Sequence, residues 1–186
     1  MRFTDRIASL HPAVVSGWSF LIFGGGALAM NALPLGSADW RLVYSLVMAL
    51  LLIPTLTWHY SIYRAASDRS VNVVGHKGRR GFLFVACATA TGIFLTTFPI
   101  WANMPYSNPS QPTLTTINSI AMGFACVSYF LAIWAAANAL TRFSEQKKLV
   151  DLSKTFATFI LELYYPIGVW FIYRRIRKAT ETPLPT

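Results

Sequence analysis

Two of the three histidines border long apolar segments, and imidazole is the side chain here best suited to ligand or proton chemistry. His11 precedes the first apolar segment, and His59 lies near the end of the second, within Trp58-His59-Tyr60. Two imidazoles at one depth on neighbouring helices are a ligand set for haem iron. Histidine beside Trp and Tyr is also common as an amphipathic anchor at a membrane surface, and we favour this interpretation.

A glycine triplet in the middle of the first apolar segment is the most unusual local feature. Each glycine inside a helix costs about 1 kcal/mol relative to alanine, so the triplet needs a compensating role. Close packing of helices through small residues is the role we favour. The alternative is a break in the helix whose free backbone groups line a ligand site, as in transporters with discontinuous helices. The residues assigned to packing or to such a site are Gly24, Gly25, Gly26, Asn31, Ala86, Ala90, Ser128, Ala132 and Ala136.

Motifs for other chemistry are missing from the sequence. The long apolar segments contain no Asp, Glu, Lys or Arg, although proton relays and cation pathways require such groups. There is no HExxH or GxSxG motif, and the cysteines and histidines lack metal-ligand spacing. The sequence therefore predicts no catalytic residue, no metal and no cofactor, with haem at His59 and His11 as the alternative.

The composition indicates a membrane protein. Of the 186 residues, 54% are hydrophobic and 12% are charged, and the charges occur in blocks between apolar runs. Four uncharged runs reach the roughly 20 residues that a helix needs to cross a bilayer. We expect an all-α integral membrane protein, a four-helix transmembrane bundle that forms one domain over residues 1–186. The predicted crossings are 13–35, 42–63, 82–102 and 116–140. The first is too long for a usual signal peptide and is expected to remain as an anchor.

The positions of the basic residues predict the orientation. With four crossings and the N-terminus inside, every Lys and Arg except Arg41 lies on the cytoplasmic side. We therefore expect both termini in the cytoplasm, and a bacterial inner membrane because no organelle-targeting signal is present. The net charge of +9 then suits anionic lipid headgroups, and not nucleic acid, because the aromatic residues lie within the apolar runs. The residues expected to face headgroups or a partner are Lys77, Arg79, Arg80, Lys147, Lys148, Arg174, Arg175, Arg177 and Lys178.

The last apolar stretch, residues 155–173, has a different pattern. Up to Tyr165 its polar and apolar residues fall on opposite helical faces, with Thr158 and Glu162 on the polar one, which predicts an amphipathic surface helix. After Pro166 the stretch is apolar all round. We expect residues 147–177 to lie in the interface to about Tyr165 and then to dip shallowly or pack against the bundle. A fifth crossing is the alternative, but it would move the basic C-terminal segment outside.

The function that best fits these features is that of an interaction module. The chain would be an accessory or assembly subunit of a larger membrane complex, or would occupy the transmembrane surface of another protein, as immunity proteins do. Its partners would be a bilayer with anionic headgroups and another membrane protein or a second copy of itself. The first alternative is transport of a small solute by an oligomer, with the glycine triplet and Asn31 as the site. The second is a haem-binding or lipid-modifying enzyme that uses His59.

Overall fold

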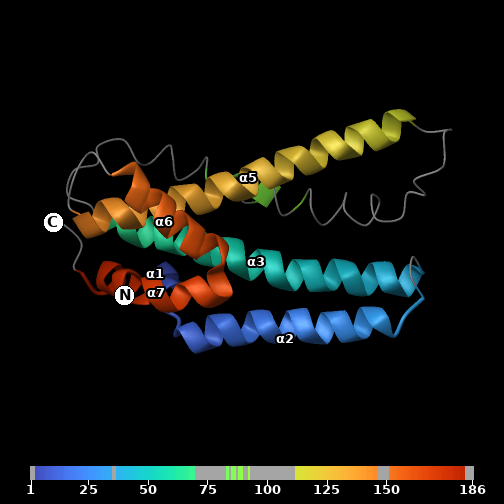
Figure 1. Cartoon of the computed structure of the whole chain (residues 1–186), viewed down its shortest axis with the longest axis horizontal. Helices are drawn as coiled ribbons and strands as arrows, with labels where there is room; N and C mark the ends of the chain where they lie inside the picture. The colour runs from blue at the N-terminus through green and yellow to red at the C-terminus, as the bar shows by residue number, and fades with distance from the viewer. Residues whose placement is uncertain are drawn as a thin grey trace.

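The computed structural model shows a bundle of three long helices, with three shorter helices at one end (Figure 1). The structure describes residues 3–34, 37–69, 112–145 and 151–182, together with six separate positions between 83 and 92. The long helices are α2 (Pro12–Asn31), α3 (Ala38–Arg69) and α5 (Pro112–Glu145), and the short ones are α1 (Phe3–Ala8), α6 (Leu152–Leu163) and α7 (Tyr165–Glu181). Throughout these ranges the structure contains helices and no strand, so the predicted all-α class is confirmed.

Three helices are long and apolar enough to cross a membrane. Their candidate spans are Pro12–Asn31, Leu42–Arg69 and Ser119–Glu145, which correspond to three of the four predicted crossings. Helix α3 extends beyond the predicted end because Ala65, Ala66 and Ser67 are buried and continue the packing surface. The predicted crossing at 82–102 lies outside the described residues, apart from the six separate positions.

Local sequence signals explain where the helices begin. The Nδ1 atom of His11 accepts a hydrogen bond from the backbone N–H of Ala13 at 3.2 Å, and proline occupies the first turn of α2. Asp151 caps α6 in the same way, because its carboxylate accepts from the N–H of Ser153 at 3.0 Å. His11 is therefore a helix cap in this fold, in addition to its edge-to-face contacts with Trp170 and Tyr173 of α7.

Small residues let the long helices approach closely. Gly26 of α2 faces α3, where a Cβ on this residue would lie 2.6 Å from Cγ2 of Val47. On α5, Ala132 and Ala136 are buried and belong to the hydrophobic core together with residues of α3. These three small residues therefore lie between helices of the described bundle, where their size permits a close approach.

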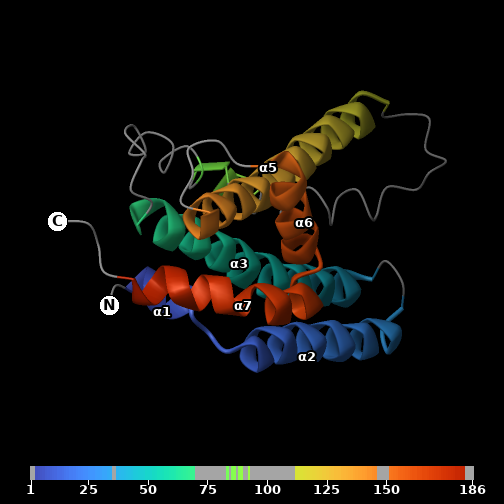
Figure 2. The same cartoon turned by 60° about the vertical axis from the view of Figure 1, so that its left-hand side comes forward.

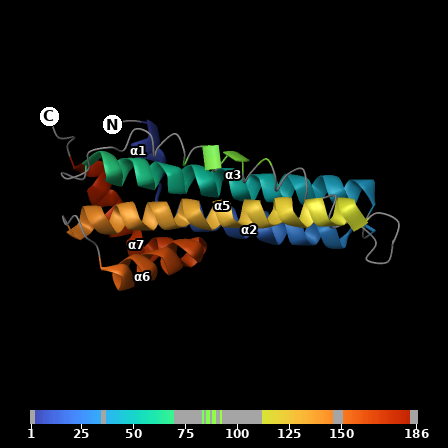
Figure 3. The same cartoon turned by 90° about the horizontal axis from the view of Figure 1, so that it is seen from above.

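Helices α6 and α7 form a hairpin that covers one half of the bundle (Figures 2 and 3). Helix α6 packs against α5, the chain turns at Tyr164, and α7 packs against α2 and α3. The turn is anchored to α2 because Ser16 donates a hydrogen bond to the carbonyl of Pro166 and accepts one from Trp170 Nε1 at 3.1 Å. Within the predicted segment 147–177, the described residues 151–177 thus form a hairpin whose two helices both pack on the bundle.

The orientation of α6 differs from that of a helix that floats on a surface. The two predicted faces exist, but the polar face points into the bundle, where Thr158 and Glu162 are 1% and 0% exposed. The apolar face points outward, with Leu152 and Phe156 71% and 54% exposed. In water the opposite orientation would be favoured, whereas polar residues of membrane proteins face the bundle interior. Periodicity revealed the two faces of α6, but not which one is buried.

A buried arginine joins the start, the middle and the end of the described fold. The Nη1 and Nη2 atoms of Arg69, at the end of α3, donate to the two carboxylate oxygens of Asp5 in α1 at 3.0 and 2.9 Å. The same guanidinium donates to the carbonyls of Thr180 and Thr182, at 3.1 and 2.5 Å, where α7 ends. Both termini consequently lie at one end of the bundle, which we call the terminal end (Figure 1).

The hairpin turn should not tolerate a side chain at Gly168. A Cβ at this position would overlap the carbonyl oxygen of Leu161, a backbone atom that cannot move aside. We expect Gly168→Ala to lower stability by about 1–3 kcal/mol, measured as a lower unfolding temperature in mild detergent. Gly123→Ala is the matched control, because a Cβ there meets no described atom within 4 Å and alanine favours a helix. Equal midpoints for the two variants would contradict this account of the turn.

Removal of the Arg69 guanidinium should unfold the terminal end. We expect Arg69→Gln to cost about 3–5 kcal/mol, because it leaves the Asp5 carboxylate buried without its bidentate partner. In Arg177→Gln the lost pair with Glu181 is exposed, at 61% and 59%, so no measurable change is expected. The comparison can be made from thermal unfolding followed by circular dichroism. Two variants of similar stability would show that Arg69 does not hold this end together.

Candidate functional site

The most unusual site in the described structure is a buried imidazole and carboxylate pair beneath α6. His59 comes from α3 and Glu162 from the inward face of α6, and both side chains are 0% exposed. The Nε2 atom of His59 lies 3.8 Å from Oε2 of Glu162, beyond the range of a hydrogen bond. A shift of about 1 Å would bring the two atoms within hydrogen-bond distance.

The backbone of α3 determines which nitrogen of His59 carries the proton. The Nδ1 atom lies 2.8 Å from the carbonyl oxygen of Thr55, one turn earlier in the helix. A carbonyl oxygen can only accept, so Nδ1 is the protonated nitrogen of the neutral ring. The Nε2 atom of the neutral ring therefore keeps its lone pair and faces Glu162, whose backbone carbonyl also interacts with the ring.

The carboxylate of Glu162, unlike Nδ1 of His59, lacks a hydrogen bond to the described backbone. Neither of its oxygens has a hydrogen-bond partner among the described residues. Burial raises the pKa of Glu162 well above its ordinary value, because the charged form loses its water. The neutral acid, with a hydroxyl that can donate, is thus the form that this environment favours.

Polar side chains continue from Glu162 along the inward face of α6. One turn earlier, Thr158 accepts hydrogen bonds from Thr141 of α5 at 3.2 Å and from Arg175 of α7 at 3.3 Å. Thr155 is also buried on this face, and Lys154 at the terminal end pairs with Glu145 of α5 at 2.6 Å. A row of polar groups therefore leads from the buried acid to the exposed end of α6.

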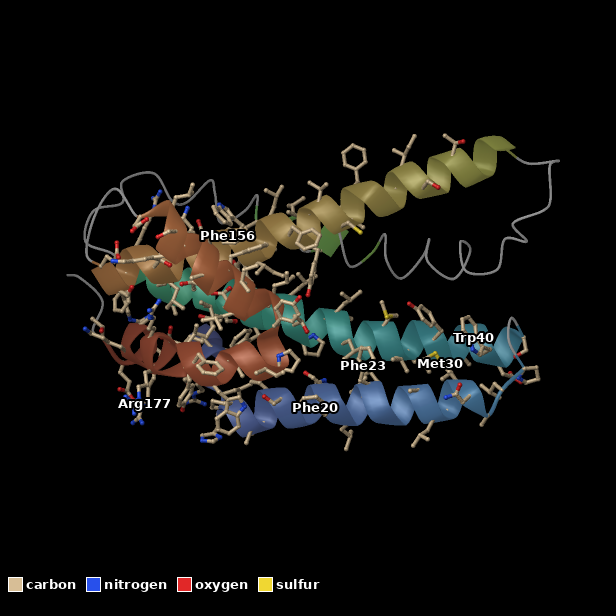
Figure 4. The ribbon with its side chains drawn as sticks, in the orientation of Figure 1. Phe20, Phe23, Met30, Trp40, Phe156 and Arg177 are labelled. Carbon is tan, nitrogen blue, oxygen red and sulfur yellow. The ribbon has the colours of Figure 1, made fainter. Side chains whose placement is uncertain are left out.

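A second candidate site is the outward face of α2. Gly17 and Gly24 are two helical turns apart, so they share a face, and Gly25 lies beside them. All three are exposed, and a Cβ on any of them would meet no described atom within 4 Å. Gly26, by contrast, points to α3. Helix α2 runs without interruption through the triplet, so no backbone groups are freed there. The exposed Phe20, labelled in Figure 4, and Asn31 belong to the same face.

The other predicted residues lie in different parts of the fold. His11 and His59 have separate partners, the cap of α2 and the pair with Glu162, and the structure does not bring them into contact with each other. Ser128 and Ala86 are half-buried, and the basic residues Arg174, Arg175, Arg177 and Lys178 are exposed on α7. Figure 4 shows Arg177 pointing away from the bundle. Ala90, Lys77, Arg79, Arg80, Lys147 and Lys148 lie outside the described residues.

An apolar groove of about 380 Å³ adjoins His59 on the other side of α3. It lies between α1, α2 and α3, and its lining includes Thr55 and Trp58, which both contact the His59 ring. Its walls are almost entirely apolar, which suits a hydrocarbon chain. The complete lining is Ile7, Leu10, Val14, Val15, Trp18, Pro54, Thr55, Thr57 and Trp58.

Sequence reasoning missed the partnership of Glu162 with His59 and that of Asp5 with Arg69. Glu162 was a visible signal, because it is the only acid in the apolar stretch 155–173. Arg69 gave no signal, since it is one of five basic residues between 64 and 80. Comparison of the chain with family models, curated proteins and solved structures gives no match.

The pair should behave as one unit when it is mutated. We expect His59→Leu and Glu162→Leu to destabilise the protein by about 1–3 kcal/mol each, because each leaves a buried polar group without its neighbour. The double variant should be less destabilised than the sum, with an interaction energy of about 0.5–3 kcal/mol. Unfolding of the four proteins in one detergent measures this energy. Additive effects would show that the two side chains are independent.

Proposed function

We propose that the chain is a polytopic membrane protein with four crossings. Helix α3 ends at the terminal end with Arg69, whereas α5 begins at the opposite end with Pro112 (Figure 1). The intervening residues, 70–111, have to connect opposite ends of the bundle, which supports the predicted crossing at 82–102. The inward polar face and outward apolar face of α6 further support a lipid surrounding.

We further propose that the terminal end faces the cytoplasm, most simply at a bacterial inner membrane. The exposed basic residues of α7 lie at this end, as does Arg6 of α1. The opposite end carries Trp40 and Tyr44, whose rings stack with centroids 5.4 Å apart, as expected for an aromatic belt (Figure 4). Attraction of the basic residues to anionic headgroups would help to hold the hairpin at that surface.

The function we propose for this bundle is that of an interaction module that docks a transmembrane helix of another membrane protein. The observation that carries the proposal is the outward orientation of Gly17, Gly24 and Gly25. Within the described fold these glycines serve no packing role, although each lowers helix stability by about 1 kcal/mol relative to alanine. In lipid, a groove of exposed glycines lets the backbone of a second helix approach closely.

The structure provides residues that separate docking from folding. Gly24 faces outward, whereas Ala132 packs inside the bundle, so leucine at the two positions should have different consequences. We expect Gly24→Leu to preserve the unfolding temperature and to abolish co-purification of the partner from native membranes. Ala132→Leu should lower stability by about 1–3 kcal/mol because it overpacks the core.

Native mass spectrometry of the protein from its own membrane measures the assembly directly. Gly123→Leu is the matched control for Gly24→Leu, because it makes the same change at an exposed glycine of α5. A second protein that is present with wild type and with Gly123→Leu, but lost with Gly24→Leu, would support the proposal. A bare monomer or a homo-oligomer from native membranes would count against it.

A further inference from the structure

The arrangement of His59 and Glu162 beneath α6 requires a proton between the two side chains. His59 Nε2 is an acceptor in the neutral ring, because Nδ1 donates to the carbonyl of Thr55. The ionised carboxylate of Glu162 is also only an acceptor. Two acceptors that face each other at 3.8 Å inside a protein repel, unless a proton lies between them. Added to the neutral ring and the ionised carboxylate, this proton can sit on Oε2 or on Nε2, and in either case one hydrogen bond can form.

We propose that Glu162 and His59 form a proton-binding site that keeps the α6–α7 hairpin closed on the bundle. With the proton bound, the O–H group of Glu162 donates to Nε2 of His59 and joins α6 to α3. When the O–H bond breaks, its electron pair stays on Oε2 and the proton passes to water or to a buffer base. The remaining carboxylate then favours a position in water, and the inward face of α6 separates from α5 and from His59 of α3. This inference does not depend on a docked partner.

The polar row along α6 gives the site a route to water. Thr158 and Thr155 lie one and two turns from Glu162 on the same inward face, in the direction of the exposed end of α6. Thr158 holds α6 to α5 and α7 through Thr141 and Arg175, so opening of this face would break those hydrogen bonds too. Separation of α6 would thus expose the acid and its route together.

The sign of the pH effect follows from the direction of the shift. Burial raises the pKa of Glu162 in the closed form above the ordinary value of 4.5 that the acid regains when it is exposed. The closed form therefore binds more protons than the open form between these two values. Closure is fully stabilised below the ordinary value and weakens as the pH rises through the raised pKa. In the alkaline limit, opening releases no proton and closure is weakest.

The other charged groups around α6 do not replace the proton. His59 is the titratable group that α3 presents to Glu162, and Arg175 on α7 donates to Thr158 one turn away. On α5, Arg142 donates to Asn138 at 3.0 Å, and Glu145 pairs with Lys154 of α6. No described cation makes a hydrogen bond to the Glu162 carboxylate.

Infrared spectroscopy of the full-length protein in lipid vesicles can test the bound proton. Wild type should show the C=O stretching band of a protonated carboxylic acid at neutral pH, and Glu162→Gln should lose it. Glu145→Gln is the control, since it removes an acid that is paired with a lysine, and it should keep the band. His59→Leu should keep the band but move it to higher frequency, because the hydroxyl loses its acceptor. Absence of the band from wild type, or its presence in Glu162→Gln, would overturn the site.

Hydrogen exchange of the α6 amides can test the coupling of the proton to closure. After correction for base catalysis, exchange of residues 152–163 in wild type should accelerate by up to about tenfold per pH unit below the midpoint of the infrared band, and should become independent of pH above that midpoint. Glu162→Gln should show no such acceleration, because glutamine carries no proton to lose. The α2 amides serve as an internal reference. An infrared band that titrates while α6 exchange stays constant would overturn the coupling.

Discussion

The guanidinium of Arg69 is the constraint on which the terminal end of the fold depends. Its donors reach a carboxylate in α1, a carbonyl of its own helix and two carbonyls at the end of α7. A planar group with five donors in fixed directions can hold several elements in one arrangement, which a lysine ammonium cannot do. A buried ion pair adds little stability in comparison with a well-packed apolar pair, but its breakage is costly. Arg69 therefore acts mainly by permitting a single arrangement of these helices.

The described structure also reverses the usual distribution of residues, in which apolar side chains are buried and polar ones are exposed. The centre of the hairpin interface is polar, with Thr158 and Glu162, whereas the outside carries large apolar side chains such as Phe156 and Trp170. Glycine shows the same inversion on α2, where Gly26 supports internal packing and Gly24 faces outward. A polar interior with an apolar exterior, or glycine on the outside of a helix, would be unfavourable in water. Both arrangements become favourable when the surrounding medium is hydrocarbon.

Hydropathy was sufficient to predict the all-α class and the three long helices of the described structure, because an uncharged run of bilayer length has few other solutions. Periodicity also separated the two faces of α6, since a 3.6-residue repeat does not depend on context. It could not say which face is buried, because that depends on the medium and on the neighbouring helices. The partners of Glu162 and Arg69 were unpredictable for a related reason. Asp5 lies 64 residues from Arg69 in the sequence, and no local pattern encodes a contact over that distance.

The hydrogen bonds of Arg69 also determine the order in which the terminal end can fold during synthesis. Helices α1 and α3 are synthesised before α7, because Thr180 and Thr182 follow Arg69 by more than a hundred residues. During that interval the guanidinium can bind Asp5 but lacks two of its acceptors. The terminal end consequently remains incomplete until α7 is synthesised. At that stage α1, α2 and α3 are already synthesised, but the contacts that α7 makes with all three of them have not yet formed.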